Sequence, residues 1–463
     1  MKRTLITTVA AGTALGLGGV ASAQDSDRTS TNTNTSTELS SLDLNRAYAS
    51  ELSADSLARR SAQADRPESA GFTLTSGPNS LNIGGLFQFG YNAGFRDESA
   101  DNVGPDQDFT QGFLIRRARL DFSGNLINDR ISYRISGDFG EINSTNNSFN
   151  VTWAYGEYAF EDALEGLSVR FGQFKLPLFY EELVEPEYQL TVDRSLTNEL
   201  FSQQYSQGLM FTYATESWRA HAAVSDGLNT AGSTFNSPGD SDIALTGRID
   251  AKLAGDWAAF DDFTSFRNSD DALRVGAAVH WEHFGDTNPA TSGNSFGISG
   301  LGIPGGGALE GDLIVYTVDA QFESNGWNVF AAFYGASVTN NRTGAAQPND
   351  FGAVVQGGYF LTDQVELFAR YDALFLDDEE RPNLDEDHLN FLTAGATYYF
   401  VPESHALKFT TDVTIAFNSG TDLATTGTGN NVLNQQRSDV TGLLGQTNER
   451  PEIAVRAQLS LTF

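Results

Sequence analysis

The sequence contains no cysteine, few basic residues and, after its first two dozen residues, no long apolar run. The absence of cysteine excludes disulfides and thiolate metal sites. Without 18 consecutive apolar residues, a helical membrane protein is not expected. Lys and Arg number 28 against 60 Asp and Glu, for a formal net charge of −32, and this balance argues against a nucleic-acid partner. What remains is a membrane β-barrel, whose alternating pattern hides its hydrophobicity, or an acidic secreted β-protein.

Three segments precede the main part of the chain. Residues 1–23 place Lys2 and Arg3 before an apolar stretch that ends at a small-x-small cleavage site, which predicts a signal peptide. Residues 24–38 are mostly Ser, Thr, Asn and Asp, so we expect a disordered linker. Residues 39–65 carry apolar side chains at roughly helical spacing, which predicts a short helical periplasmic segment, either a coiled coil or a single solvated helix.

From residue 79 onward, apolar and polar residues alternate along segments that turn residues separate. In the last of them, Ile453, Val455, Leu459 and Phe463 alternate with polar residues, and a period of two indicates a strand with one apolar face. Sixteen strands are predicted, at 79–95, 112–126, 129–140, 150–160, 165–175, 205–216, 217–227, 242–254, 271–283, 310–322, 325–338, 349–361, 364–374, 387–400, 404–418 and 450–463. The predicted fold is all-β, a transmembrane antiparallel β-barrel of about 16 strands over 79–463.

The connections between these strands alternate between short and long, as in outer-membrane barrels with short periplasmic turns and long outer loops. The segment 255–270 is the one turn longer than this pattern expects. A charged Arg or Lys facing lipid at mid-depth costs about 2–4 kcal/mol, so the charged faces must line a polar interior, wide enough for an aqueous channel. Aromatic residues near strand ends suit interfacial girdles: Trp153, Tyr155, Trp218, Trp281, Trp327, Tyr398, Tyr399 and Phe400.

Two motifs carry a resemblance to a known family. The run Arg116-Arg117-Ala118-Arg119-Leu120 lies within 114–140, and Gly172-Gln173-Phe174-Lys175-x-Pro177 lies within 169–188. Together, and ahead of a terminal Phe, they resemble the phosphate-selective porins (O/P type) of Gram-negative outer membranes, and the likeness extends loosely over 79–463. The resemblance implies a homotrimeric porin in the outer-membrane lipid bilayer, whose loop 176–204 folds inward as a constriction. It also implies passive diffusion of small anions such as phosphate, or of small hydrophilic solutes in general, and no enzymatic activity.

Strand 112–126 shows how charges would enter the lumen, because Arg117, Arg119 and Asp121 share one face while Arg116 stands on the apolar face. The predicted pore-lining or constriction residues are Arg117, Arg119, Asp121, Arg134, Arg170, Lys175, Arg194, Arg248, Arg370 and Arg456. Cations on many strands favour anions in a pore. Alternatively, they pair with strand carboxylates and brace the wall.

The ion preference therefore stays open, and so do two other functions. Loop 176–204 also carries acids that would favour cations: Glu181, Glu182, Glu185, Glu187, Asp193 and Glu199. A structural role is possible if 39–65 tethers the barrel to periplasm or cell wall. A barrel hydrolase would need His221 in the lumen, but no GxSxG is present. The pair His280 and His283 falls on opposite strand faces, so neither a metal nor a cofactor is predicted.

Overall fold

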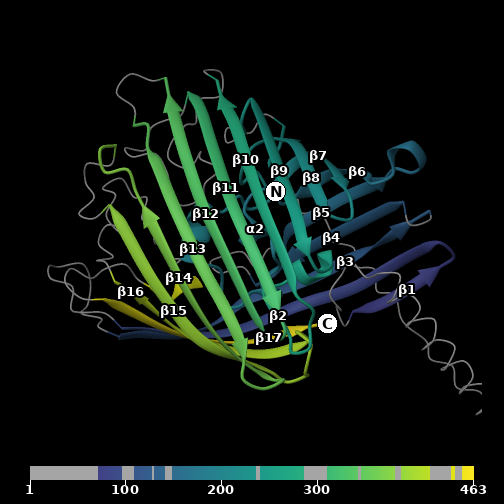
Figure 1. The fold of residues 1–463 in the computed structure, drawn as a ribbon. Helices are drawn as coiled ribbons and strands as arrows, with labels where there is room; N and C mark the ends of the chain where they lie inside the picture. The colour runs from purple at the N-terminus through teal and green to yellow at the C-terminus, as the bar shows by residue number, and fades with distance from the viewer. Residues whose placement is uncertain are drawn as a thin grey trace, which may run out of the picture. The chain divides into compact units, whose positions relative to one another are not determined.

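A computed structural model describes residues 71–95, 109–127, 130–140, 149–235, 240–285, 310–341, 346–380, 387–417, 440–443 and 451–463. Within these residues, sixteen antiparallel strands, β2 to β17, form a closed ring, because β9 pairs with β10 and β17 pairs with β2 (Figure 1). This confirms the predicted all-β antiparallel barrel. The predicted signal peptide 1–23, linker 24–38 and helical segment 39–65 lie outside the described residues.

The predicted strands agree with the observed ones to within three residues at every end. The strands are β1 Phe72–Ser76, β2 Asn79–Phe95, β3 Phe109–Leu126, β4 Ile131–Asp138, β5 Asn150–Ala159, β6 Leu167–Phe174, β7 Ser206–Ala214, β8 Trp218–Ser225, β9 Ile243–Ala254, β10 Ala272–Phe284, β11 Gly311–Ser324, β12 Trp327–Asn340, β13 Asn349–Phe360, β14 Val365–Phe375, β15 His388–Tyr399, β16 Leu407–Ala416 and β17 Glu452–Thr462. Strand β1 was not predicted; it pairs with the start of β2, with Phe72 opposite Ile83.

The described helices are short, and their bounds are η1 Asp162–Leu164, α2 Tyr180–Leu183, η2 Pro186–Tyr188, α3 Leu196–Phe201 and η3 Trp257–Phe260. In the described part of the chain, no helix combines the length and the apolar character that crossing a membrane requires. Three of these helices, α2, η2 and α3, belong to the connection between β6 and β7, and η3 belongs to the turn between β9 and β10.

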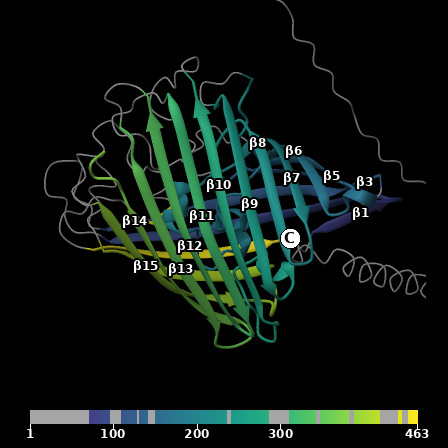
Figure 2. The ribbon, with the colours of Figure 1, turned by 45° about the horizontal axis from the view of Figure 1, so that its top comes forward.

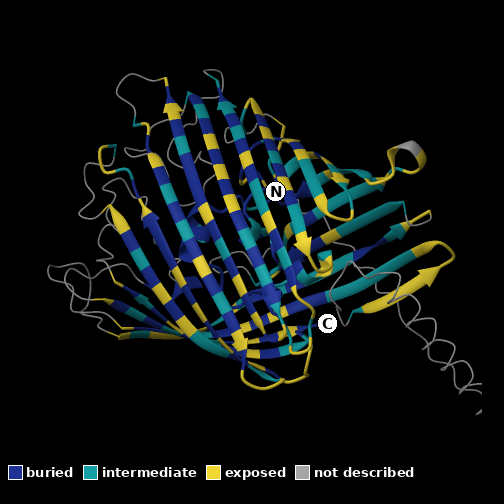
Figure 3. Ribbon diagram, in the orientation of Figure 1, coloured by how far each residue is buried: buried dark blue, intermediate teal, exposed yellow. Residues whose placement is uncertain are grey.

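Exposure alternates along the strands, as Figure 3 shows most clearly on β10 to β15. In β14, Leu367 and Tyr371 are 43% and 47% exposed, whereas Glu366 and Arg370 are 0% and 3% exposed. The apolar face points outward and the charged face points into the barrel, as the alternation predicts. Figures 1 and 2 show β9 to β15 side by side along one wall, which continues through β16 and β17 to β2.

Register shifts interrupt the alternation and redirect specific side chains. Between β2 and β3, Gln88 pairs with Arg117 and Phe89 pairs with Ile115, so Arg116 is the extra residue of a β-bulge. A bulge re-aims the side chains beside it. This explains how Arg116, which the pattern placed on the apolar face, reaches an interior carboxylate, described below.

A second bulge, in β5, corrects part of the girdle prediction. Ser136 pairs with Trp153 and Gly137 with Val151, which leaves Thr152 as the extra residue. Trp153 is therefore buried inside, where the Arg134 guanidinium lies 4.8 Å from its ring centroid. The girdle prediction is also wrong for two other residues: Tyr155 lies under Arg170, and the buried Tyr399 donates from its hydroxyl to Glu366. Exposed aromatics do occur near strand ends at Trp218, Trp327, Tyr398 and Phe400.

The molecule has its apolar core inside the barrel, where the segment 175–205, here called the inner loop, packs on the wall. Phe179 and Phe201 of the loop are fully buried and stack against Tyr334 of β12, with ring centroids 4.9 Å and 5.8 Å from it. The wall contributes further buried apolar side chains, among them Phe330 and Val354. A barrel of this size would otherwise enclose an open aqueous lumen, so the inner loop decides how much of that lumen remains.

The unexpectedly long turn Gly255–Asp271 also folds against the inner loop. Its Phe260 and Phe263 are buried, and the Tyr180 hydroxyl donates a hydrogen bond to the Phe260 carbonyl. The Phe263 amide donates to the Tyr188 carbonyl over 3.2 Å. This turn therefore supports the inner loop from the end of the barrel at which β9 ends and β10 begins.

Candidate functional site in the barrel lumen

The two sequence motifs hold the inner loop at its base. Gly172 has φ +121°, and a Cβ there would lie 2.2 Å from the Ala154 carbonyl oxygen, so this position requires glycine. The Gln173 amide donates to the carbonyls of Val151 and Thr152 at the β5 bulge, over 2.8 Å and 3.0 Å. Phe174 is fully buried, and Lys175 then starts the loop. The second motif, residues 172–177, is thus bonded to the bulge of β5, and from it the chain turns into the barrel.

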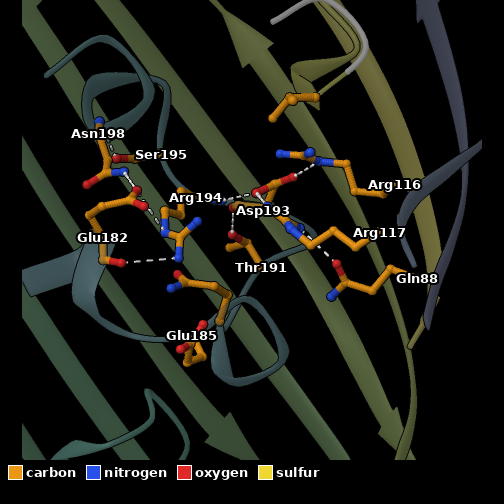
Figure 4. A network of polar contacts seen from close by, with 12 residues as sticks. Gln88, Arg116, Arg117, Glu182, Glu185, Thr191, Asp193, Arg194, Ser195 and Asn198 are labelled. Carbon is orange, nitrogen blue, oxygen red and sulfur yellow. Dashed lines mark hydrogen bonds and ion pairs between the residues drawn. The ribbon is translucent and has the colours of Figure 1, made fainter. Parts of the chain in front are cut away.

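The first motif, Arg116-Arg117-Ala118-Arg119-Leu120, binds the inner loop through Asp193, as Figure 4 shows. The carboxylate of Asp193 lies 2.6 Å from Arg116 Nε and 3.3 Å from Arg117 Nη2, and it accepts a hydrogen bond from the Arg194 amide. Arg117 also donates to the Gln88 side chain over 2.8 Å. Burial alone would raise the pKa of Asp193, but Arg116 and Arg117 outweigh burial and hold the pKa well below its usual range. Asp193 therefore remains charged and pairs with both arginines.

A second ion-pair group lies within the loop itself. The carboxylate of Glu182 is 2.6 Å from Lys175 Nζ and 3.3 Å from Arg194 Nε, and it accepts from the Asn198 amide. Burial opposes ionisation, but Arg194 and Lys175 lower the pKa of Glu182 to about 2. Arg194 further donates to the Val184 carbonyl over 2.7 Å. These bonds fix the path of the loop between α2 and α3.

A third group ties the loop to strands β3 and β4. Glu185 lies 3.3 Å from Arg119 Nη1 and 2.7 Å from Arg134 Nη1, and Arg134 also contacts Asp121. Burial would raise the pKa of Glu185, but Arg134 and neighbouring cations lower it to about 2. Another loop acid, Glu181, accepts from the amide and hydroxyl of Ser195, which also caps α3, and from the Tyr334 hydroxyl.

The remaining candidate residues on the wall are paired as well. Arg248 lies 2.6 Å from Asp250 and 2.9 Å from Asp319, and both carboxylates also contact Arg274. The other pairs are Arg170–Glu157 at 2.7 Å, Arg370–Asp372 at 3.6 Å and Arg456–Asp412 at 2.8 Å. Arg370 additionally donates to the Asp193 carbonyl over 2.9 Å.

All ten predicted site residues thus point into the barrel, and each of the nine cations among them lies against a carboxylate. Of the two interpretations left open by the sequence, the bracing one describes these contacts. Asp193 and Glu185 of the loop pair with cations of the wall, and Glu182 pairs with Lys175 and Arg194, so a count of charges along the sequence does not give the charge that the lumen presents. The role of these residues in permeation stays a prediction.

Space remains on the side of the inner loop that faces β5 to β10. A cavity of about 470 Å³ lies there, bounded by the loop, by the strands and by the turn Gly255–Asp271. Its charged lining residues are Glu157, Arg170, Lys175, Arg219, Arg248, Asp250, Asp261 and Arg274. The sequence alone does not group Arg219 and Arg274 with Lys175, because the pairing of β8 with β9 and of β9 with β10, and the inward fold of the loop, bring them together. The sequence signal that could have found Arg219 and Arg274 is their position on the inward face of their strands.

Each of the three histidines considered in the sequence contacts a polar side chain of the barrel wall. His221 lines the cavity and its Nδ1 lies 2.9 Å from the Thr212 hydroxyl. His280 contacts Thr246 inside the barrel, whereas His283 contacts Asp312, 2.9 Å away. Among the described residues, no group of three or more His, Cys, Asp or Glu side chains is arranged to hold a metal ion.

Comparisons with known proteins agree with this architecture. The profile of the family described as phosphate-selective porin O and P matches residues 87–425. Comparison with curated proteins gives no significant match. Among solved structures, the anion-selective porin from Comamonas acidovorans is similar at 11% identity, with a TM-score of 0.52 over 83% of this chain and 100% of that chain. The outer membrane channel DcaP of Acinetobacter baumannii is similar at 14% identity, with a TM-score of 0.51 over 84% and 99%. At these identities the likeness to solved structures shows the fold alone.

Proposed function

Because the chain belongs to the family of phosphate-selective porins O and P, we propose that it is a homotrimeric channel that conducts small anions passively across the bacterial outer membrane. Family and fold point to a channel rather than an enzyme. Solutes would cross beside the inner loop, through the space that the loop leaves against β5 to β10. The outward apolar face of the strands suits the lipid bilayer as the surrounding medium.

The observation that carries the anion preference is the charge of the cavity. Its lining has five cationic side chains against three carboxylates. Four of the cations have carboxylate partners, but Arg219 makes no ion pair with any described residue; its guanidinium lies 4.1 Å from the centroid of the Trp257 ring. A cation without a carboxylate partner beside an aqueous space attracts anions, and its donors can replace part of an anion's hydration shell.

The proposal is tested by reversal potentials in planar bilayers across a potassium chloride gradient, with purified protein. The wild-type channel is expected to prefer chloride. Arg219→Gln should lower the anion-to-cation permeability ratio by about two- to fivefold, because a unit charge at contact distance in water is worth about 1 kcal/mol.

Arg130→Ala serves as the matched control, since it removes one positive charge from a half-exposed turn position, where Arg130 pairs with Glu161 away from the cavity. It should leave the permeability ratio unchanged. A cation-preferring wild-type channel, or equal effects of the two substitutions, would refute the anion preference. Trimers are assayed on the same samples by mass measurement in detergent.

A further inference from the structure

The cavity beside the inner loop is larger than an inorganic anion needs. Its volume of about 470 Å³ falls within the roughly 300–1,000 Å³ that is typical of small-molecule sites. Such sites combine an apolar lining with a few polar groups that fix orientation. The cavity has apolar side chains from the inner loop, β7 and the long turn, but eight of its lining residues are charged, so its polar groups decide which ligand chemistry it accepts.

The buried polar atoms without a partner in this lining are donors. Arg274 is 1% exposed and its guanidinium lies over the Tyr180 ring; its Nη1 donates to Asp250 and Asp319 over 3.0 Å and 2.7 Å, whereas its Nε and Nη2 have no hydrogen-bond partner among the described residues. The indole Nε1 of the buried Trp153 is in the same situation. A buried donor left without an acceptor costs about 1–3 kcal/mol of folding free energy. These donors therefore favour a ligand that brings acceptor oxygens.

A third donor group, Arg219, reaches the cavity from the neighbouring strand β8. Its guanidinium is stacked on Trp257 and has no carboxylate partner in the described part of the chain. The planar guanidinium presents a fork of N–H donors that matches the two oxygens of a carboxylate. The stacking on Trp257 holds the fork in place before a ligand arrives.

Part of the lining is apolar. Leu183 and Val184 of the inner loop, Met210 of β7 and Phe260 of the long turn all border the cavity. An inorganic phosphate placed here would leave this surface uncovered and would lose hydration without enough donors to replace it. A ring-sized hydrocarbon body would instead bury the apolar side while its anionic group meets the arginines.

We propose that the cavity binds organic carboxylates with a ring-sized apolar body in preference to inorganic phosphate. The carboxylate accepts hydrogen bonds from Arg219 and Arg274, and the apolar body packs on Leu183 and Met210. The inference rests on the proposed channel function in assigning the cavity to the permeation route, and it names amphipathic carboxylates as the anions that this route binds most tightly.

Benzoate, inorganic phosphate and benzyl alcohol are suitable probes, titrated into full-length protein in detergent. Binding is read from tryptophan fluorescence, to which Trp153 and Trp257 of the cavity contribute. Benzoate should bind about tenfold or more tightly than phosphate, because its ring buries apolar surface, and than benzyl alcohol, which lacks the charge. Arg219→Gln and Leu183→Asn should each weaken benzoate binding by about fivefold or more.

Equal affinity for benzoate and phosphate would overturn the proposal, as would unchanged benzoate binding in both variants. Because Leu183→Asn leaves every lining charge in place, it keeps the test decisive if Arg219→Gln fails to fold. Chloride conductance is recorded separately in bilayers. A channel that conducts and prefers chloride but does not bind benzoate refutes this inference alone, whereas a protein that forms no channel, or a channel that prefers cations, refutes the proposed function.

Discussion

The two sides of the barrel wall differ in what lies against their inner faces. On β16 and β17, the inward-facing Asp412 and Arg456 are at most 2% exposed. On β6 and β8, the inward-facing Arg170 and Arg219 retain intermediate exposure. The same kinds of charged residue thus occupy a packed environment on one side and the edge of a cavity on the other.

The inner loop contributes to this difference because it is bonded to β16 on the packed side, although Arg248 of β9 also donates to its Leu178 carbonyl. The Val192 amide donates to Asp412 over 3.1 Å, and Lys408 Nζ donates to the Gln189 carbonyl over 3.0 Å. The cavity separates the loop from β6 to β8. The inner loop therefore gives this sixteen-stranded barrel both a packed core and a cavity, and the following substitutions test how the loop is attached.

The largest effect is expected from removing the loop's apolar anchor. Phe179 is fully buried against Tyr334, and truncating a core phenylalanine costs about 3–5 kcal/mol. With Phe179→Ala the loop should detach from the packed side, so that single-channel conductance rises and the loop becomes sensitive to protease. Phe171→Ala is the control, because that side chain is 52% exposed on the outer face. Unchanged conductance in Phe179→Ala would show that the apolar contact does not hold the loop.

A smaller effect is expected at the ionic attachment of the loop to β3. Asp193→Asn leaves Arg116 and Arg117 without their carboxylate, and breaking a buried pair costs about 3 kcal/mol or more. The midpoint of thermal unfolding, followed by circular dichroism, should fall, and anion preference should rise as two guanidinium groups lose their partner. In the control Asp363→Asn, the partner is the exposed Arg267, 3.6 Å away, and such surface pairs contribute about 0–1 kcal/mol. Equal midpoints for the two variants would contradict the structural role of Asp193.

The smallest effect concerns the proton of Lys175 at the edge of the cavity. Burial, with Arg194 acting in the same direction, lowers the pKa of Lys175 to about 8 although Glu182 and Glu185 oppose the shift. The side chain is charged at pH 7 and loses its positive charge as the pH rises through 8, so the anion-to-cation permeability ratio should fall between pH 7 and pH 9. The change is about twofold, since a unit charge about 8 Å away in water is worth about 0.5 kcal/mol.

Lys175→Arg provides the control for this titration, because arginine stays protonated throughout that pH range. Reversal potentials of the variant should be independent of pH between 7 and 9. The same pH dependence in Lys175→Arg as in the wild-type channel would assign the titration to another group.

The barrel could be predicted from the sequence because its signal, the alternation of apolar and polar residues, is local. A period of two needs no knowledge of the partner strand, so β2 to β17 were located to within three residues. Bulges are not local, since they arise from the pairing of two strands. For that reason the inward turn of Arg116, and the position of Trp153 inside the barrel rather than in a girdle, could not be anticipated.

The contacts of the site could be predicted less well, because they join residues that lie far apart in the sequence. The inward strand positions of Arg117 and Arg119 follow from alternation. Their partners do not: Asp193 and Glu185 reach them only because the loop folds inward. The turn Gly255–Asp271 was noticed for its length, yet nothing local in its sequence indicates that it packs beneath the loop.

The pairing of β17 with β2 has a consequence for how the protein folds. The register runs from Phe95 opposite Ile453 to Leu86 opposite Thr462. This pairing, here called the seam, joins the two strands of the ring that lie farthest apart in the sequence. Contacts at such sequence separation form slowly, since the loop-closure entropy is lost before the pairing is gained. Until the seam forms, two long sheet edges remain open to foreign strands. The longer β2 and β17 remain unpaired during assembly, the more the barrel needs protection from pairing with foreign strands.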